Sequence, residues 1–222
     1  MDTPTRLVLI RHGESRSTVD QVVGGHEGCT GLSDQGRRQA EALAARLQHT
    51  GELSDTSVLL TSILPRAIET AEIIAPALGG LVAKQDCDLC EIHPGEGDGL
   101  TWEEFRNRYM PADGSRDPYR AWSPGGESWA TFMARVGVTL GDVAKRHPGE
   151  TVVVVCHGGV IEGAFSALGN QPLRRPFDIS VENTSITEWR WGDRAALPGV
   201  PPGEVRWKLV RFNDAAHLHR LG

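Results

Sequence analysis

Polar side chains with catalytic potential stand where three apolar runs of the sequence end. The runs cover residues 7–10, 57–61 and 151–156. The side chains that follow them are Arg11, His12, Ser62, Arg66 and His157. Open α/β sheets bind ligands beyond the carboxyl ends of their parallel strands. If the three runs are neighbouring strands, these five side chains therefore lie together at one edge of a sheet.

This set of side chains suits phosphoryl transfer. Arginine offers a planar fork that matches phosphate oxygens, and a neutral histidine such as His12 is a competent nucleophile. Glycines follow both histidines, and at Gly158 a backbone N–H could approach an anion at a helix start. A leaving oxygen also needs a proton, which the carboxyl group of Glu91, just after a further strand candidate, could supply. The residues therefore favour transfer of a phosphoryl group through a covalent intermediate.

The elements that must position these side chains can be read from hydrophobic patterning. Continuous apolar runs predict strands at 6–11 and 151–156 that are buried on both faces. Further strands are expected at 57–61 and 81–85, and a hairpin at 184–191 and 205–212. Helices are expected at 34–48, 63–78, 101–109, 128–147 and 159–169, the first capped by Ser33 and the third by a Thr101–Glu104 capping box. The alternating order predicts an α/β fold, a three-layer α/β/α sandwich with a mostly parallel central sheet.

No linker divides the chain, so we expect a single domain over residues 1–222. The segment 110–127 contains three prolines and three glycines and predicts a long loop, which we expect to cover the site. Within it, Trp122 is the tryptophan expected nearest the ligand.

Composition excludes several function classes. Of the 222 residues, 39% are hydrophobic and 23% charged, and the formal net charge is −6 with no basic block, which argues against nucleic-acid binding. No 18-residue apolar run exists, so no membrane span is expected. The apolar run near the N-terminus is too short for a signal peptide, which favours a cytoplasmic protein. The oligomeric state stays open, a homodimer included.

The four cysteines do not suggest a catalytic or metal site. Cys87 and Cys90 form a lone C-x-x-C, and a zinc site needs two further ligands at recognisable spacing. Because no second cysteine pair exists, we expect no metal. Cys156 stands in an apolar run and predicts a buried, inert thiol. His217 and His219 are expected in a solvated tail.

Ordered blocks of the sequence resemble the histidine phosphatase superfamily, the phosphoglycerate mutase-like enzymes. They occur in the family's order and span residues 7 to about 190. The blocks are LIRHGES, LSDQGRRQA, TSILPRAIETA, LCEIHPGEGDGLTWEE, PGGES with VCHGGVI, and NTSITEW. A single R-H-G would be weak support, but ordered blocks over most of the chain are strong support for the superfamily, and the absence of the mutases' long insertion favours its phosphatase branch.

The resemblance implies a role for each matching position. His12 would be the nucleophile that forms a phosphohistidine, and Glu91 would protonate the leaving group and then take a proton from water. Arg11, Arg66 and His157 would bind the phosphoryl group. Ser62 and the backbone at Gly158 would add hydrogen bonds. The family needs neither a metal nor an organic cofactor for hydrolysis.

Two departures from the family pattern concern the site. The family often has asparagine six residues after the nucleophile, where this chain has Thr18, whose hydroxyl can still donate over a shorter reach. The family's Trp-Glu pair after the acid is replaced by Gly97-Asp98, so Glu96 and Asp98 could share the acid role with Glu91.

The leading interpretation is a phosphomonoesterase that hydrolyses a small phosphate ester and releases inorganic phosphate. The alternative is a cofactor-dependent phosphoglycerate mutase, but the chain lacks the long insertion between the acid and the second histidine that such enzymes carry. An inactive phosphate-binding protein is less favoured, because the nucleophile and both arginines are present. The substrate depends on the loop at 110–127 and on residues near Gly25 and His26, and the sequence leaves it open.

Overall fold

A six-stranded sheet forms the centre of the molecule in the computed structural model, which describes residues 3–115, 117–173, 178–192 and 206–220. Its strand order is β3-β2-β4-β1-β5-β6. The strands are β1 (Thr5–Arg11), β2 (Thr56–Thr61), β3 (Lys84–Gln85), β4 (Thr151–Cys156), β5 (Ile186–Trp191) and β6 (Trp207–Asp214). The first four pair in parallel, whereas β5 runs antiparallel to both β1 and β6. The sheet is thus mixed and mostly parallel, as predicted.

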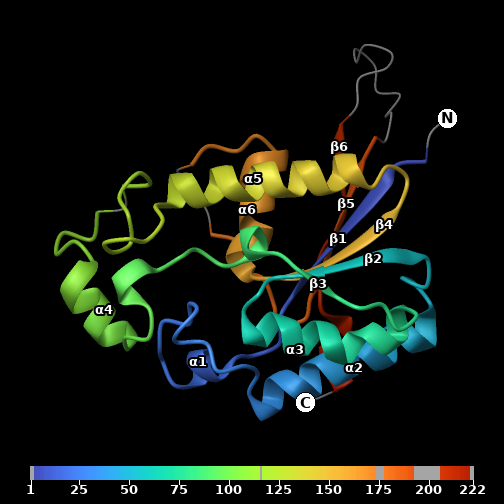
Figure 1. Cartoon of the computed structure of the whole chain (residues 1–222), viewed down its shortest axis with the longest axis horizontal. Helices are drawn as coiled ribbons and strands as arrows, with labels where there is room; N and C mark the ends of the chain where they lie inside the picture. Colours follow the sequence, from blue (N-terminus) through green and yellow to red (C-terminus); the bar gives the residue numbers. More distant parts are fainter. Residues whose placement is uncertain (1–2, 116, 174–177, 193–205, 221–222) are drawn as a thin grey trace.

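Helices cover both faces of this sheet (Figure 1). The longer helices are α2 (Asp34–Thr50), α3 (Pro65–Ile74), α5 (Trp129–Arg146) and α6 (Gly158–Leu168). The pair α5 and α6 lies on one face, and the pair α2 and α3 on the other. Short helices are α1 (Arg16–Val19), α4 (Trp102–Tyr109) and the 3₁₀ turns η1 (Ala75–Leu78), η2 (Cys87–Leu89), η3 (Gly95–Gly97) and η4 (Ala216–Arg220). The predicted α/β/α sandwich is confirmed.

Burial on both faces explains the continuous apolar run of β1. Leu7 and Leu9 pack into the core beneath α5 and α6, whereas Val8 and Ile10 pack into the core beneath α2 and α3. All four side chains are fully buried. A strand between two helical layers has no solvent face, so its sequence does not alternate with polar residues.

Several boundaries differ from the sequence expectation. The helix expected at 63–78 begins at Pro65 and ends at Ile74, and a 3₁₀ turn with Pro76 in its first positions follows. Proline has no backbone N–H to continue the α-helical pattern, which accounts for the early end. The strand expected at 81–85 contains only Lys84–Gln85.

Other local predictions are confirmed. Ser33 caps α2, and Thr101 and Glu104 form the capping box of α4. β5 and β6 pair as an antiparallel hairpin, although their connection at 193–205 lies outside the described residues. Across the described part of the chain, no helix has the length and apolar character that crossing a bilayer would require.

Candidate active site

A cavity of ≈ 360 Å³ opens beyond the carboxyl end of β1. Six of the nine residues expected to be catalytic or to bind substrate line it, and they are Arg11, His12, Thr18, Gly25, Arg66 and Glu91. They come from strand ends and from loops that are far apart in the sequence. The parallel sheet therefore gathers a histidine, two arginines and a carboxyl group from the sequence prediction around one small volume, which Glu162 also lines.

The hydrogen bonds of His12 determine which ring nitrogen can react. Its side chain is buried, and its Nδ1 lies 2.6 Å from the carbonyl oxygen of Gly13. A carbonyl can only accept, so Nδ1 carries the proton. Nε2 then holds the free electron pair, and it accepts a hydrogen bond from Nε of Arg66 at 3.0 Å. Burial, and then the positive charges of Arg66 and Arg11, hold the pKa of His12 well below its usual value. The imidazole is therefore neutral and nucleophilic at Nε2.

The two arginines are held by backbone carbonyls beside this nitrogen. Nη1 of Arg66 donates to the carbonyl of Gly24 at 2.7 Å, and Nη1 of Arg11 donates to the carbonyl of Val181. Nε of Arg11 is buried and has no hydrogen-bond partner among the described residues. Burial lowers the pKa of Arg11 from its usual value. A buried guanidinium with an unused donor next to a cavity is a ready partner for an anion.

His157 lies behind His12 rather than on the cavity wall. The two rings are edge to face with centroids 5.0 Å apart, and His157 is fully buried. Its Nε2 is 2.8 Å from the hydroxyl of Ser62, while its Nδ1 has no partner within the described structure. Burial and then the charge of Arg66 hold the pKa of His157 well below its usual value. Ser62 thus orients His157.

Gly158 begins helix α6 directly after this histidine. A Cβ built at Gly158 would lie 3.5 Å from Nε of Arg11, an ordinary contact distance. The start of α6 is therefore close to the guanidinium of Arg11.

Glu91 and Glu162 are the two carboxyl groups that line the cavity, and Glu91 is the one singled out from the sequence. Its Oε2 accepts a hydrogen bond from the backbone N–H of Gly159 at 3.0 Å, in the first turn of α6. Asp98 is instead occupied by three backbone N–H groups, those of Gly25, Glu27 and Gly28, at 2.8 to 3.0 Å. Glu96 is exposed. Neither Glu96 nor Asp98 lines the cavity, so the geometry favours Glu91 over both.

Gly25 and Thr18 line the cavity, and both take part in hydrogen bonds within the protein. The N–H of Gly25 is already donated to Asp98, so this position contributes shape rather than a hydrogen bond. The hydroxyl of Thr18 lies 2.9 Å from that of Ser15, which also lies 2.9 Å from the hydroxyl of Ser17.

Sequence reasoning missed several residues at the cavity. Ser15 and Ser17 line it, and Asn183 donates from Nδ2 to the backbone carbonyl of His12 at 2.9 Å. The first two stand within five residues of the nucleophile, and Asn183 lies in the NTSITEW block. Their closeness to recognised motifs was the one sequence feature that could have indicated these residues. Their residue types and spacing form no pattern that points to a site.

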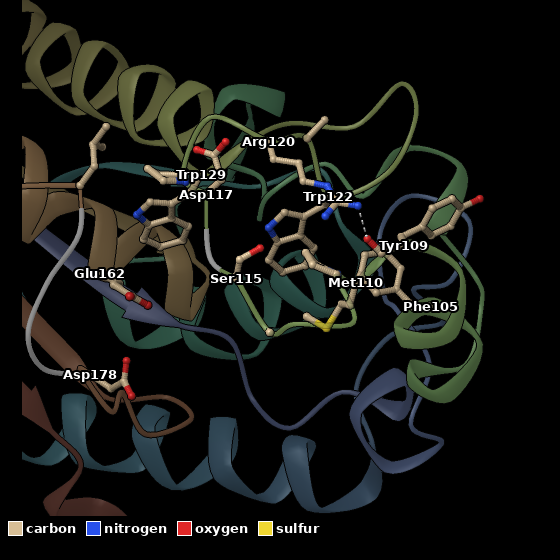
Figure 2. A pocket seen from close by; sticks show the side chains of 15 residues that line it. Phe105, Tyr109, Met110, Ser115, Asp117, Arg120, Trp122, Trp129, Glu162 and Asp178 are labelled. Carbon is tan, nitrogen blue, oxygen red and sulfur yellow. Dashed lines mark hydrogen bonds between the residues drawn. The ribbon is translucent and has the colours of Figure 1, made fainter.

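A larger cavity of ≈ 700 Å³ adjoins the first one (Figure 2). Trp122, Trp129 and Glu162 line both cavities. Phe105, Tyr109 and Met110 add apolar surface to the larger one. Much of its wall comes from the described part of the segment 110–127, which contains no helix or strand before the cap of α5. The predicted long loop is therefore present and lies beside the site.

Three further sequence expectations have clear outcomes. Cys156 is fully buried, and burial raises the pKa of its thiol, as expected for an inert core cysteine. The prediction that His217 lies in a solvated tail is wrong. His217 is buried, and its Nε2 forms a hydrogen bond with the hydroxyl of Thr184 at 2.8 Å. The argument against a metal also fails, since His26 and His93 both lie beside Cys87 and Cys90.

Known proteins resemble this chain over nearly its whole length. Phosphoglycerate mutase-like protein 4 of Arabidopsis thaliana is 32% identical over 97% of this chain and 88% of its own. Phosphoserine phosphatase 1 of Hydrogenobacter thermophilus is 34% identical over 96% of this chain and 94% of its own. A solved mycobacterial glucosyl-3-phosphoglycerate phosphatase in complex with vanadate superimposes with a TM-score of 0.74 at 29% identity, over 94% of this chain and 98% of that one.

The family model for the histidine phosphatase superfamily (branch 1) matches residues 7–197. This range contains every residue that lines the ≈ 360 Å³ cavity. With two relatives above 30% identity over almost the whole chain, the protein belongs to branch 1 of the histidine phosphatase superfamily.

Proposed function

We propose that this protein is a phosphomonoesterase that hydrolyses a phosphate ester through a phosphohistidine on His12. The observation that carries the proposal is the fixed tautomer of His12, with the proton on Nδ1 bound to Gly13 and the electron pair of Nε2 beside the guanidinium of Arg66. A phosphoryl group that replaces the Arg66–Nε2 hydrogen bond would meet a nucleophile and a cation at one point. Phosphoryl transfer needs little more than such positioning and charge stabilisation.

In the first step, Nε2 of His12 attacks phosphorus and the ester oxygen leaves with its electron pair. Glu91, in its protonated form, gives this oxygen a proton, and the alcohol departs. In the second step, the Glu91 carboxylate takes a proton from water, and the oxygen of that water attacks phosphorus. The P–N bond breaks, inorganic phosphate is released, and both His12 and Glu91 return to their starting forms. Arg11 and Arg66 stabilise the charge on the equatorial oxygens throughout.

The larger cavity supports a substrate with a sizeable apolar or ring-bearing alcohol part. It shares Trp122, Trp129 and Glu162 with the cavity of His12 and Glu91. Its wall carries the aromatic rings of Phe105, Trp122 and Trp129 (Figure 2). Aromatic side chains in a cavity wall stabilise ligands through the apolar surface that the ligand buries, rather than through its charge. We therefore expect ring-bearing esters to be better substrates than small ones such as phosphoserine.

Phosphate release from a panel of phosphomonoesters tests this function, with EDTA present and 3-phosphoglycerate in the panel. We expect release by the wild type and none by His12→Ala. Acid-labile phosphate bound to the wild type after a rapid quench would identify the intermediate. Interconversion of 2- and 3-phosphoglycerate without net release would favour the mutase instead, and the absence of both activities would leave only phosphate binding.

A further inference from the structure

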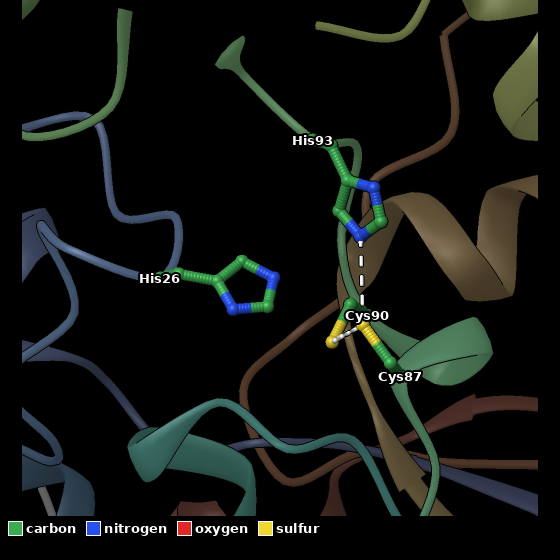
Figure 3. A group of neighbouring side chains, drawn as sticks. All are labelled: His26, Cys87, Cys90 and His93. Atoms are coloured by element: carbon green, nitrogen blue, oxygen red, sulfur yellow. Dashed lines mark hydrogen bonds between the residues drawn. The ribbon is translucent and has the colours of Figure 1, made fainter. Parts of the chain in front are cut away.

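Two cysteines and two histidines form a compact cluster beside the active site (Figure 3). Cys87 and Cys90 lie at the two ends of the η2 turn, His93 lies three residues further on, and His26 comes from a loop near the N-terminus. One ligand atom from each residue lies within 4.8 Å of the other three. No disulfide joins the cysteines.

We propose that these four side chains bind one structural zinc ion. Zinc in proteins takes four ligands in a tetrahedron, with Zn–S near ~2.3 Å and Zn–N near ~2.0 Å, and Cys₂His₂ is one of its commonest donor sets. Such a tetrahedron places two sulfurs about 3.8 Å apart, and a sulfur and a nitrogen about 3.5 Å apart. Here the Sγ atoms of Cys87 and Cys90 are 3.9 Å apart, and Sγ of Cys87 lies 4.0 Å from Nε2 of His93. The cluster therefore needs only small shifts to close around the ion.

Neighbouring groups already orient two of the ligands as zinc requires. Nδ1 of His93 lies 3.8 Å from Oε2 of Glu127, so the opposite nitrogen, Nε2, is the one turned toward the cysteines. A carboxylate behind the far nitrogen of a ligating histidine is a recurrent feature of zinc sites. The hydroxyl of Ser62 donates to Sγ of Cys90 at 3.2 Å, which would stabilise a thiolate. Two thiolates balance the charge of Zn²⁺, so the closed site is neutral and can sit partly buried.

The position of the cluster indicates a structural role. Glu91 stands between the ligands Cys90 and His93, and Gly25 at the cavity precedes the ligand His26. A metal would fasten these two loops to each other on one side of the cavity. All four metal positions would be filled by protein, so no position would remain for substrate or water. The ion would therefore stabilise the loop that holds Glu91 and would take no part in the reaction.

The test is the zinc content of the full-length protein purified under reducing conditions without chelator. We expect one zinc per chain by elemental analysis and by native mass spectrometry. The variants Cys87→Ser, His26→Asn and His93→Asn should each retain less than about a fifth of it. Cobalt added to the metal-free protein should give the visible absorption of a tetrahedral site and a thiolate charge-transfer band. Metal removal should lower Tm by at least about 5 °C.

Two controls separate ligation from other effects. Cys29 packs in the same small apolar cluster as Cys90 but is not one of the four ligands, so Cys29→Ser should keep its zinc. His12→Ala, which we expect to be inactive, should bind zinc like the wild type, so this result does not depend on the proposed activity. His26 is exposed, so His26→Asn tests a ligand without disturbing the core.

Three results would overturn the proposal. One is wild-type protein that neither contains zinc nor takes up an equimolar amount once reduced. Another is equal zinc content in the wild type and His26→Asn. The third is a stable Cys87–Cys90 disulfide in freshly purified protein, which would indicate a redox pair instead.

Discussion

The carboxylate of Glu91 accepts a hydrogen bond at Oε2 from the backbone N–H of Gly159, at 3.0 Å. The absence of a side chain at Gly159 makes this contact feasible, since a Cβ there would lie 2.1 Å from Oε1 of Glu91. The first turn of α6 therefore sets the position of the proposed acid, and the glycine is a positioning residue.

Gly159→Ala should accordingly displace Glu91 and lower kcat for an alkyl phosphate by about 10- to 100-fold. This loss is smaller than the loss expected when a general acid is removed altogether. The new Cβ would also lie 3.0 Å from Cε1 of the buried Phe132, so the melting temperature is measured beside kcat to separate lost packing from a displaced Glu91. Gly141→Ala in α5 is the matched control, since a Cβ there meets nothing within 4 Å. Equal kcat values for the wild type and Gly159→Ala would show that Glu91 does not act from this position.

Glu91→Gln should slow an alkyl phosphate by about 10²- to 10⁴-fold. A nitrophenyl ester should be slowed far less in its first step, because its oxygen leaves without a proton. Rapid-quench measurement of phosphohistidine formation on both esters separates this step from hydrolysis. Equal slowing of formation for the two esters would rule out general-acid catalysis by Glu91.

The sequence was sufficient for most of the fold and for the centre of the site. Strand β4 is buried throughout and β1 is buried from Leu7 to Ile10, so their apolar runs are easily recognised, and the polar residues after them are expected at the sheet edge. The position of His12 at the end of β1 follows from the sequence for this reason. Short edge strands such as β3 carry no such pattern, which is why its length was overestimated.

Contacts between distant loops could not be predicted in the same way. His26 and Cys87 stand 61 positions apart, and no periodicity links them. The spacing Cys87-x-x-Cys90-x-x-His93 is a local signal for a metal, but a criterion that requires two cysteine pairs does not detect it. The choice between Glu91 and Asp98 also needed the structure, because only there does Asp98 prove to be occupied by three backbone N–H groups.

The neutral state of His12 can be measured directly. Burial and the charges of Arg66 and Arg11 lower its pKa, so removal of one charge in Arg66→Met should raise the pKa of His12 toward its usual value near 6.5. NMR titration of ring-labelled histidine follows this shift, with assignment by His12→Ala. Arg38→Met on the exposed side of α2 should leave the titration unchanged. An unchanged pKa in Arg66→Met would mean that the guanidinium does not act on the imidazole.

Trp122 is expected to determine substrate preference rather than catalysis. Its ring lines both cavities and packs on Phe105 at a centroid distance of 5.9 Å. Trp122→Ala should lower kcat/KM for 1-naphthyl phosphate by about 10-fold or more, corresponding to a loss of about 1.4 kcal/mol of binding energy. For phosphoserine the change should be within about threefold. Trp191→Ala, at the far end of β5, is the control, and equal losses on both esters would contradict a specificity role.

The buried His217 should make stability depend on pH. Burial lowers its pKa from 6.5 to about 4. Between these values the unfolded chain binds a proton that the folded chain does not, so the free energy of unfolding falls as the pH falls. The stability gained by burying neutral His217 is fully present above pH 6.5. It is lost progressively as the pH falls to about 4, below which it changes no further.

Urea denaturation of the wild type and His217→Gln at pH 7, 6 and 5 measures this contribution. His12 and His157 act in the same direction in both proteins, so only the difference between the two proteins reports on His217. The stability advantage of the wild type should shrink by on the order of 2 kcal/mol over this range. His49→Gln on the surface of α2 should show a constant difference. A constant difference for His217→Gln as well would mean that His217 is protonated equally in the folded and unfolded states.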